Sequence, residues 1–138
     1  MTINWAKLVP ELTVSDFETS LEFYKALGFE LLFERPGFAY LEFEGVQWMI
    51  QCLENDDWQT ASLEKPFGRG INFQIECKDA TVIRNKLDAR NYELFRDLKD
   101  SWYKTGEVLS GQREFLVQDP DGYLLRFAQS LGEKELAK

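Results

Sequence analysis

The chain has 138 residues, enough for one domain over residues 1–138 that buries a core without a metal or a disulfide. Its 24 Asp and Glu against 16 Lys and Arg give a formal net charge of −8, which argues against nucleic-acid binding because phosphate contacts need clustered basic side chains. The acidity has two interpretations: solubility, or a field that attracts a cationic ligand. The sequence shows no signal-peptide pattern and no long apolar run, so we expect a cytoplasmic protein that does not enter a membrane.

Residues 8–14 are predicted to form the first strand, because apolar and polar side chains alternate there with the period of a half-buried strand. A helix is expected to follow. Ser15 and Glu18 have the spacing of a capping box, in which each side chain bonds the other residue's backbone amide. Gly28 can end this helix in the left-handed conformation. The apolar stripe of the helix consists of Phe17, Leu21, Tyr24 and Leu27.

Three short strands, at 29–34, 38–44 and 46–52, complete the first half. The second half repeats this order after a polar join at 54–69 that contains Pro and Gly. It is predicted as a strand at 70–77, a helix capped by Asp79 with Val82, Ile83 and Leu87 on its buried side, and strands at 92–96, 113–118 and 123–129.

The two halves, about 6–54 and 69–131, each read as strand, helix and three strands. The expected fold class is therefore α+β, with two tandem βαβββ units that form a curved mixed sheet and carry their helices on its convex side. Cys52 and Cys77 both fall on apolar strand faces. We interpret them as small buried residues rather than as a disulfide pair.

Three separated motifs resemble those of the glyoxalase/bleomycin resistance protein/dioxygenase superfamily, also called the vicinal oxygen chelate superfamily. They are the segment VPELTVSD at 9–16, Phe23-Tyr24 followed by Leu27-Gly28-Phe29, and the segment DPDGYLLR at 119–126. The likeness extends over residues 8–132. Within the superfamily, the chain is most similar to bleomycin resistance proteins of the transposon-borne type.

The resemblance also implies where a metal would bind in other members of the superfamily. Their ligand positions fall here on Val9, on Gly70 or Ile71, and on Arg126. Aliphatic side chains have no lone pair and a guanidinium has no acceptor. Because the sequence contains no His at all, we expect no metal site, no cofactor and no glyoxalase or dioxygenase activity.

By resemblance, the protein is a non-catalytic homodimer that sequesters a bleomycin-family glycopeptide antibiotic, with or without metal in the drug, in clefts at the dimer interface. Such a drug is cationic and carries a planar moiety. Exchange of the first strand between subunits is associated in that branch with a proline at the position of Pro10. An ordinary edge-strand proline is the alternative interpretation.

Strand alternation predicts which side chains line the ligand-binding side of the sheet. Phe38 and Gln51 also match ligand-contact positions of the branch, whereas its two stacking tryptophans correspond here to Asn72 and to Ser110 or Gly111. Trp102 and Tyr103 lie in a polar segment, 99–111, that we interpret either as a lid over the cleft or as an interface or loop anchor. The predicted ligand-binding residues are Phe38, Tyr40, Gln51, Asn72, Gln74, Trp102, Tyr103 and Arg126.

Some alternatives stay open at the level of sequence. Arg126 either binds ligand or forms an ion pair with Glu11, Glu42 or Glu76 that holds the halves together. The protein either sequesters bleomycin, or sequesters or senses another planar cationic compound. An enzyme without metal, with Glu11, Glu76 or Glu114 as general acid or base, is the third hypothesis.

Overall fold

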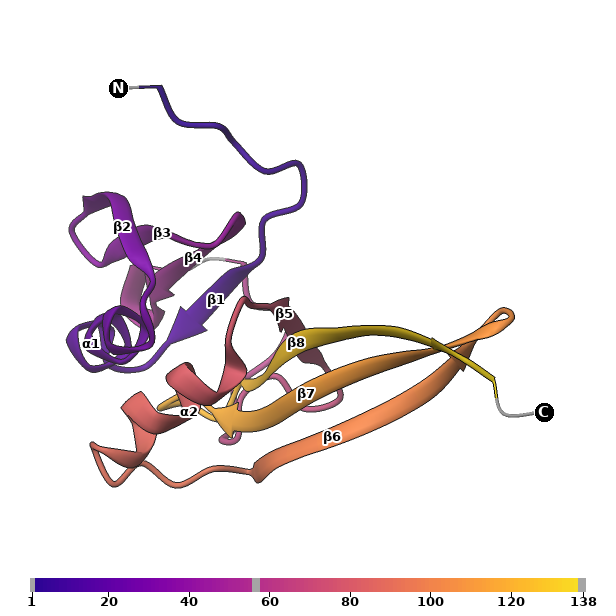
Figure 1. The fold of residues 1–138 in the computed structure, drawn as a ribbon. Coiled ribbons are helices and arrows are strands. Elements are labelled where there is room, and N and C mark those ends of the chain that lie inside the picture. Colours follow the sequence, from indigo (N-terminus) through magenta and orange to yellow (C-terminus); the bar gives the residue numbers. More distant parts are fainter. Residues whose placement is uncertain (1, 56–57, 137–138) are drawn as a thin grey trace. The chain divides into compact units, whose positions relative to one another are not determined.

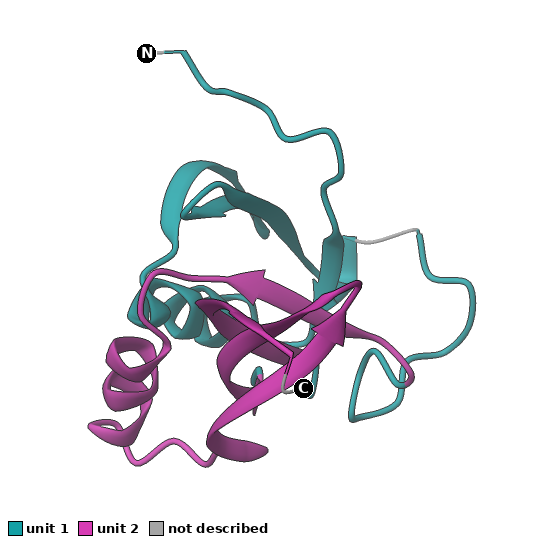
Figure 2. Ribbon diagram, turned by 45° about the vertical axis from the view of Figure 1, so that its right-hand side comes forward, with its two compact units in different colours: residues 1–69, 119–123 teal, residues 70–118, 124–138 magenta. Residues whose placement is uncertain are grey.

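A computed structural model describes residues 2–55 and 58–136, and the chain within it divides into two compact units. Unit 1 takes the residues up to Arg69 together with Asp119–Tyr123, and unit 2 takes Gly70–Gln118 and the residues from Leu124 on (Figure 2). The chain thus returns to unit 1 for five residues before its last strand. Each unit is described by itself below.

Unit 1 contains one four-stranded sheet in the order β1-β4-β3-β2 and one helix (Figure 1). Strand β1 runs parallel to β4, and the other pairs are antiparallel. In chain order the elements are β1 (Glu11–Val14), α1 (Phe17–Leu27), β2 (Glu30–Arg35), β3 (Phe38–Phe43), β4 (Val46–Cys52) and the 3₁₀ turn η1 (Leu53–Asn55).

Unit 2 has the same connectivity, with the sheet order β5-β8-β7-β6 and with β5 parallel to β8. Its elements are β5 (Asn72–Glu76), α2 (Ala80–Asp88), β6 (Arg96–Thr105), β7 (Val108–Gln118) and β8 (Leu124–Glu135). The tandem βαβββ plan is therefore confirmed. Its strands form two separate four-stranded mixed sheets, one in each unit, where a single mixed sheet was expected.

Helix α1 begins one residue later than the capping box predicts. The N-cap is Asp16, which has extended backbone angles and accepts a hydrogen bond of 3.1 Å from the amide of Thr19. The predicted cap, Ser15, instead gives both its amide and its hydroxyl to Asp121. The predicted end is confirmed, since Gly28 has the left-handed angles (φ 112°) that glycine adopts without strain.

Helix α2 begins as predicted, with the carboxylate of Asp79 accepting from the amide of Val82 at 3.2 Å. Ala80, Ile83 and Leu87 form its buried side. The prediction that Val82 belongs to this side was wrong, because Val82 is exposed. Among the described residues, no helix is both long enough and apolar enough to cross a membrane.

The strands differ most from prediction at their ends. The alternating pattern of residues 8–14 begins before the ladder does, so Leu8 is exposed and β1 starts at Glu11. The last three strands are much longer than expected, and the strand predicted at 92–96 lies at Arg96–Thr105. The added parts of these strands carry few apolar side chains, so the sequence shows no alternation there that would have predicted them. They are defined by the backbone pairing of β6 with β7 and of β7 with β8.

Aromatic packing dominates the core of unit 1. The ring of Trp48 stacks on Phe29 at 4.9 Å between centroids and meets Tyr24 edge to face at 5.4 Å. In unit 2, Phe115 and Phe127 stack at 5.3 Å. Each helix packs on the core face of its sheet. In β3 the side chains of the opposite face are buried as well.

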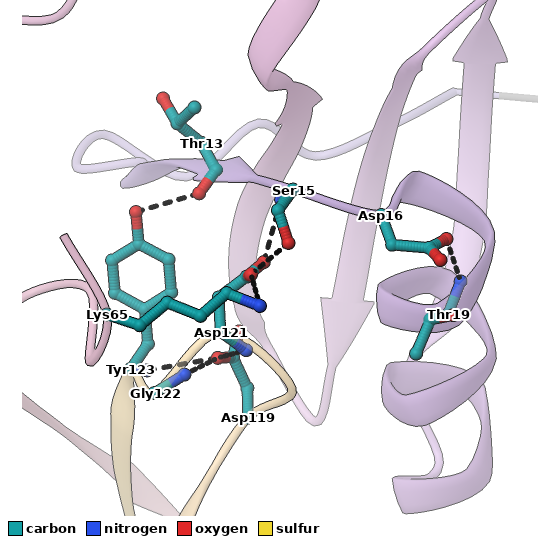
Figure 3. Close-up of polar contacts among 9 residues, drawn as sticks. All are labelled: Thr13, Ser15, Asp16, Thr19, Lys65, Asp119, Asp121, Gly122 and Tyr123. Carbon is teal, nitrogen blue, oxygen red and sulfur yellow. Dashed lines mark hydrogen bonds and ion pairs between the residues drawn. The ribbon is translucent and has the colours of Figure 1, made fainter. Parts of the chain in front are cut away.

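The turn Asp119–Tyr123 is fastened to the start of helix α1 in unit 1 (Figure 3). One carboxylate oxygen of Asp119 accepts from three backbone amides of its own turn, and the other accepts from the Tyr24 hydroxyl at 2.7 Å.

The next residues of the turn make further contacts within unit 1. Asp121 accepts from Ser15 and lies 3.4 Å from the ammonium of Lys65. Tyr123 donates to the carbonyl of Thr13 at 2.9 Å. Burial raises the pKa of Asp119 to about 6, against the lowering effect of the bonds from Tyr24 and the backbone.

Candidate ligand-binding site

The face of the first sheet that points away from its aromatic core carries three of the predicted site residues. Phe38 lies opposite Gln51, and Tyr40 lies opposite Met49, across the β3–β4 ladder. Directly opposed residues of an antiparallel pair project to the same side. We call this side the A face; it carries Glu11, Thr13, Phe33, Arg35, Phe38, Tyr40, Glu42, Gln47, Met49 and Gln51.

An aromatic cluster occupies the A face. Phe33 and Tyr40 are cross-strand neighbours whose rings stack at 5.3 Å with an interplanar angle of 17°. Trp5, from the segment before β1, meets both of them edge to face, at 5.9 Å from Phe33 and 5.0 Å from Tyr40. The guanidinium of Arg35 lies 4.2 Å from the centre of the Phe38 ring, in a cation–π contact. The cluster therefore combines stacked aromatic rings with a cationic group, the Arg35 guanidinium, that already lies over the Phe38 ring.

The buried amide of Gln47 connects this cluster to the N-terminal segment. Its oxygen accepts from the Ala6 amide at 2.8 Å and from the Tyr40 hydroxyl at 2.7 Å. Its nitrogen donates to the carbonyl of Asn4 at 2.7 Å and to the carboxylate of Glu42 at 2.6 Å. All the hydrogen bonds that this amide can make are thus made, and two of them fasten the backbone on either side of Trp5. Burial, and then the charge of Glu42, raise the pKa of the Tyr40 hydroxyl.

Exposure separates the members of the cluster. Phe38 and Tyr40 are only 5% and 6% exposed, whereas Trp5 is 57% exposed. Phe38 and Tyr40, the two aromatic residues that strand alternation predicted, therefore expose little ring surface. The exposed ring is that of Trp5, which precedes β1. The predicted ligand-binding residues do not include Trp5, because no periodic pattern places residue 5 over a sheet.

The second sheet brings together three more of the predicted residues. Gln74 lies opposite Arg126 and Asn72 opposite Leu124 on the β5–β8 ladder. The guanidinium of Arg126 donates to Glu114 at 3.1 Å and, at 3.3 Å, to Asn72. Arg126 thus forms an ion pair, but with Glu114 on the adjacent strand β7 and not with Glu11, Glu42 or Glu76 as predicted. The pair lies within one sheet and does not join the halves.

Trp102 and Tyr103 do not lie in a lid loop. The segment 99–111 forms the β6–β7 hairpin, with Trp102 opposite Gly111 and Tyr103 opposite Ser110. As adjacent residues of a strand they project to opposite faces, Tyr103 to the side of Glu114 and Trp102 to the other. The Trp102 ring packs on Gly111, and the ammonium of Lys134 lies 3.9 Å from its centre.

Pro10 lies directly before β1, and its carbonyl accepts from the amide of Met49 at 2.9 Å. This bond extends the β1–β4 pairing by one residue. Proline can take part because it contributes its carbonyl here, and its missing N–H is not required. The pairing seen here is within one chain, and strand exchange stays a prediction.

A separate hollow of about 390 Å³ lies in unit 1, lined by Ser15, Asp16, Phe17, Glu18, Gly37, Cys52, Leu53 and Glu54. None of the predicted ligand-binding residues lines it. Cys52 is half-buried there and Cys77 is buried in unit 2, and neither cysteine forms a disulfide. Within residues 2–55 and 58–136, no group of three or more Cys, Asp or Glu side chains is placed to hold a metal ion.

The comparison with protein families decides the membership of this chain. Residues 2–127 match the model of the Glyoxalase/Bleomycin resistance protein/Dioxygenase superfamily. The chain belongs to this superfamily. The superfamily resemblance inferred from the motifs at 9–16 and 119–126 is thereby confirmed.

Several known proteins are similar to this chain over nearly their whole length. Bleomycin resistance proteins from Geobacillus stearothermophilus and Staphylococcus aureus (strain N315) are each 27% identical, over 89% of this chain and 96% of theirs. The crystal structure of a protein of unknown function from Agrobacterium tumefaciens str. C58 is 27% identical, with a TM-score of 0.68, over 94% of this chain and 98% of that one. The fold is thus shared along the full length.

Proposed function

We propose that this protein binds a bleomycin-family glycopeptide antibiotic reversibly and sequesters it without chemical change. The observation that carries the proposal is the similarity to proteins named bleomycin resistance protein, which extends over 96% of their length. The absence of His in the sequence agrees with a binding role, since His is the residue that most often serves as metal ligand and as acid–base catalyst.

The chemistry of the A face supports this ligand class. Aromatic rings attract planar and cationic groups through dispersion and through their quadrupole. The guanidinium of Arg35, itself a planar cation, lies above the Phe38 ring on this face. The formal net charge of −8 adds a long-range attraction for a positively charged drug. We therefore expect affinity that falls with rising salt concentration.

We further propose that the binding unit is a homodimer with the drug in clefts at the interface, with Pro10 at the point where the first strand crosses to the other subunit. Mass measurement under native conditions tests this part. A monomer at micromolar concentration would reject the composite cleft while leaving binding by a single chain open to titration.

A second candidate is sequestration or sensing of another planar cationic compound. It is favoured by the side chains at the family's two tryptophan positions. Asn72 is hydrogen-bonded to Arg126, and Gly111 is covered by the Trp102 ring. Asn72 and Ser110 carry no aromatic ring, and the indole that covers Gly111 already has the Lys134 ammonium over it. A cationic ligand therefore has to find its stacking surface elsewhere.

The catalytic alternative has less support. Glu114, one of its proposed acid–base residues, is bound to Arg126. Asp119 has the raised pKa that general acid–base catalysis uses, but its side chain is buried and both of its oxygens accept hydrogen bonds from the protein. A substrate has no access to it.

Calorimetric titration of the EDTA-treated protein with metal-free and with copper-loaded bleomycin tests the proposal. We expect saturable binding of one drug per subunit and, by mass spectrometry, unaltered drug after incubation. Absence of heat with both forms would reject bleomycin as the ligand, and displacement assays with other planar cations would then test the second candidate. Release of a modified drug would favour the enzyme.

A further inference from the structure

The N-terminal segment Asn4–Ala6 is a fixed part of the A face. It is fastened by two backbone hydrogen bonds to one buried side chain, Gln47. The same side chain is held by Tyr40 and Glu42, so the attachment point is itself rigid. A segment held in this way loses little conformational entropy when a ligand binds to it, which lowers the cost of binding.

The geometry of the cluster leaves indole surface uncovered. Trp5 lies nearly perpendicular to both Phe33 and Tyr40, with interplanar angles of 78° and 88°, and those two rings are almost parallel to each other. Both neighbours therefore contact the indole from the side of the sheet. More than half of the Trp5 surface stays open, which leaves indole surface available for stacking.

Of the four aromatic residues predicted for the site, three are less able to stack on a cationic ligand, and the fourth, Tyr103, is 50% exposed. The Phe38 ring is buried and covered by Arg35. The Tyr40 ring is buried beneath Trp5 and beside Phe33. Trp102 packs on Gly111 and already has the Lys134 ammonium over its ring, and this charge repels a cation.

We propose that Trp5 is the stacking platform for the planar cationic group of the ligand, and that the segment Asn4–Ala6 is part of the binding site. The Trp5 indole supplies the stacking surface that Asn72 lacks and that the ring over Gly111, with the Lys134 ammonium on it, does not offer to a cation. The carboxylate of Glu42, bound to the Gln47 amide beneath the segment, supplies negative charge beside it. This inference rests on the proposed function and adds to it the residue that recognises the planar group.

The test compares four proteins by titration with metal-free bleomycin: the native chain, Trp5→Ala, Trp5→Phe and Trp58→Ala. Loss of one stacking platform lowers affinity by about 5- to 150-fold. We expect a loss in this range for Trp5→Ala and a smaller loss for Trp5→Phe, which keeps an aromatic ring. Trp58→Ala removes another exposed tryptophan, outside the helices and sheets, and its affinity is expected to equal that of the native chain.

The outcomes separate the two proposals. If the native chain does not bind bleomycin, the proposed function fails and the role of Trp5 fails with it. If the native chain binds and Trp5→Ala binds equally well, only the role of Trp5 is overturned. An equal loss in Trp58→Ala would also overturn it, because the effect would then belong to any exposed indole. Should Trp5→Ala lower the melting temperature, Trp5→Phe decides. A smaller loss of affinity in a natively stable Trp5→Phe supports an aromatic platform, and a loss as large as in Trp5→Ala contradicts it.

Discussion

The hydroxyl of Tyr24 donates a hydrogen bond of 2.7 Å to the carboxylate of Asp119, which is 95 residues later in the chain. This bond joins the buried side of helix α1 to the turn that returns to unit 1 between β7 and β8. Because three backbone amides bond the other oxygen of the same carboxylate, the protonation state of Asp119 bears directly on how this turn is held.

The raised pKa of Asp119 predicts a change of stability with pH. The pKa of Asp119 is about 6 in the folded protein and 3.8 for an unperturbed Asp, the value taken for the unfolded chain. The folded protein therefore binds this proton more tightly than the unfolded chain does. The stabilisation from this proton is complete below pH 4 and is lost as the pH rises to 6. The difference of about 2 pKa units corresponds to about 3 kcal/mol.

Urea unfolding of the native chain and of Asp119→Asn at a series of pH values measures this effect. We expect the stability of the variant, relative to the native chain, to rise between pH 4 and 6 by about 3 kcal/mol and to stay level above pH 7. Tyr24→Phe is the matched variant, because losing the hydroxyl removes a bond that lowers the pKa of Asp119; its transition should lie at higher pH. A stability difference that does not depend on pH would contradict the prediction.

Replacing Gln47 with Leu is expected to destabilise unit 1 and to release the segment before β1. The change leaves the Tyr40 hydroxyl and the Glu42 carboxylate without their bonds to the amide, at a cost of about 1–3 kcal/mol. Hydrogen exchange at the Ala6 amide, which donates to Gln47, reports the release. Gln51→Leu, on the same face, is the control and should leave that exchange rate unchanged.

Replacing Arg35 with Met should increase the affinity for a planar cation. The change removes the positive charge that lies over the Phe38 ring. Since a cation–π contact contributes about 0.5–1 kcal/mol, we expect binding of metal-free bleomycin to tighten about two- to fivefold. Arg96→Met makes the same change of charge beside Phe95 in unit 2 and controls for net charge. Weaker binding in Arg35→Met alone would show that the drug uses this guanidinium.

Gly111 is expected to tolerate no larger side chain as long as Trp102 is present. A Cβ at residue 111 would lie 2.7 Å from two carbons of the indole, closer than packed atoms come. We expect Gly111→Ala to cost about 1–3 kcal/mol and to shift the tryptophan emission. The same substitution in a Trp102→Ala background should cost much less, and an equal cost in both backgrounds would place the strain in the backbone.

Local patterns in the sequence determined much of the fold. The alternation at 46–52 predicted the bounds of β4 and, with Phe38 and Tyr40, which side chains share the A face, because the period of two is a property of a single strand. Asp79 and Gly28 marked one start and one end of a helix because capping is satisfied within a few residues. The motifs at 9–16 and 119–126 indicated the superfamily.

Only the tertiary structure decided the features that depend on distant partners. Ser15 and Asp16 both carry an oxygen that can cap α1, and the choice followed from Asp121, 106 residues away, which engages Ser15. The hairpin of 99–111 forms by pairing between strands that show little apolar alternation. Trp5 reaches the A face through Gln47, more than 40 residues later. Contacts of this range leave no period in the sequence, so the exposed ring of the proposed site could be found only in three dimensions.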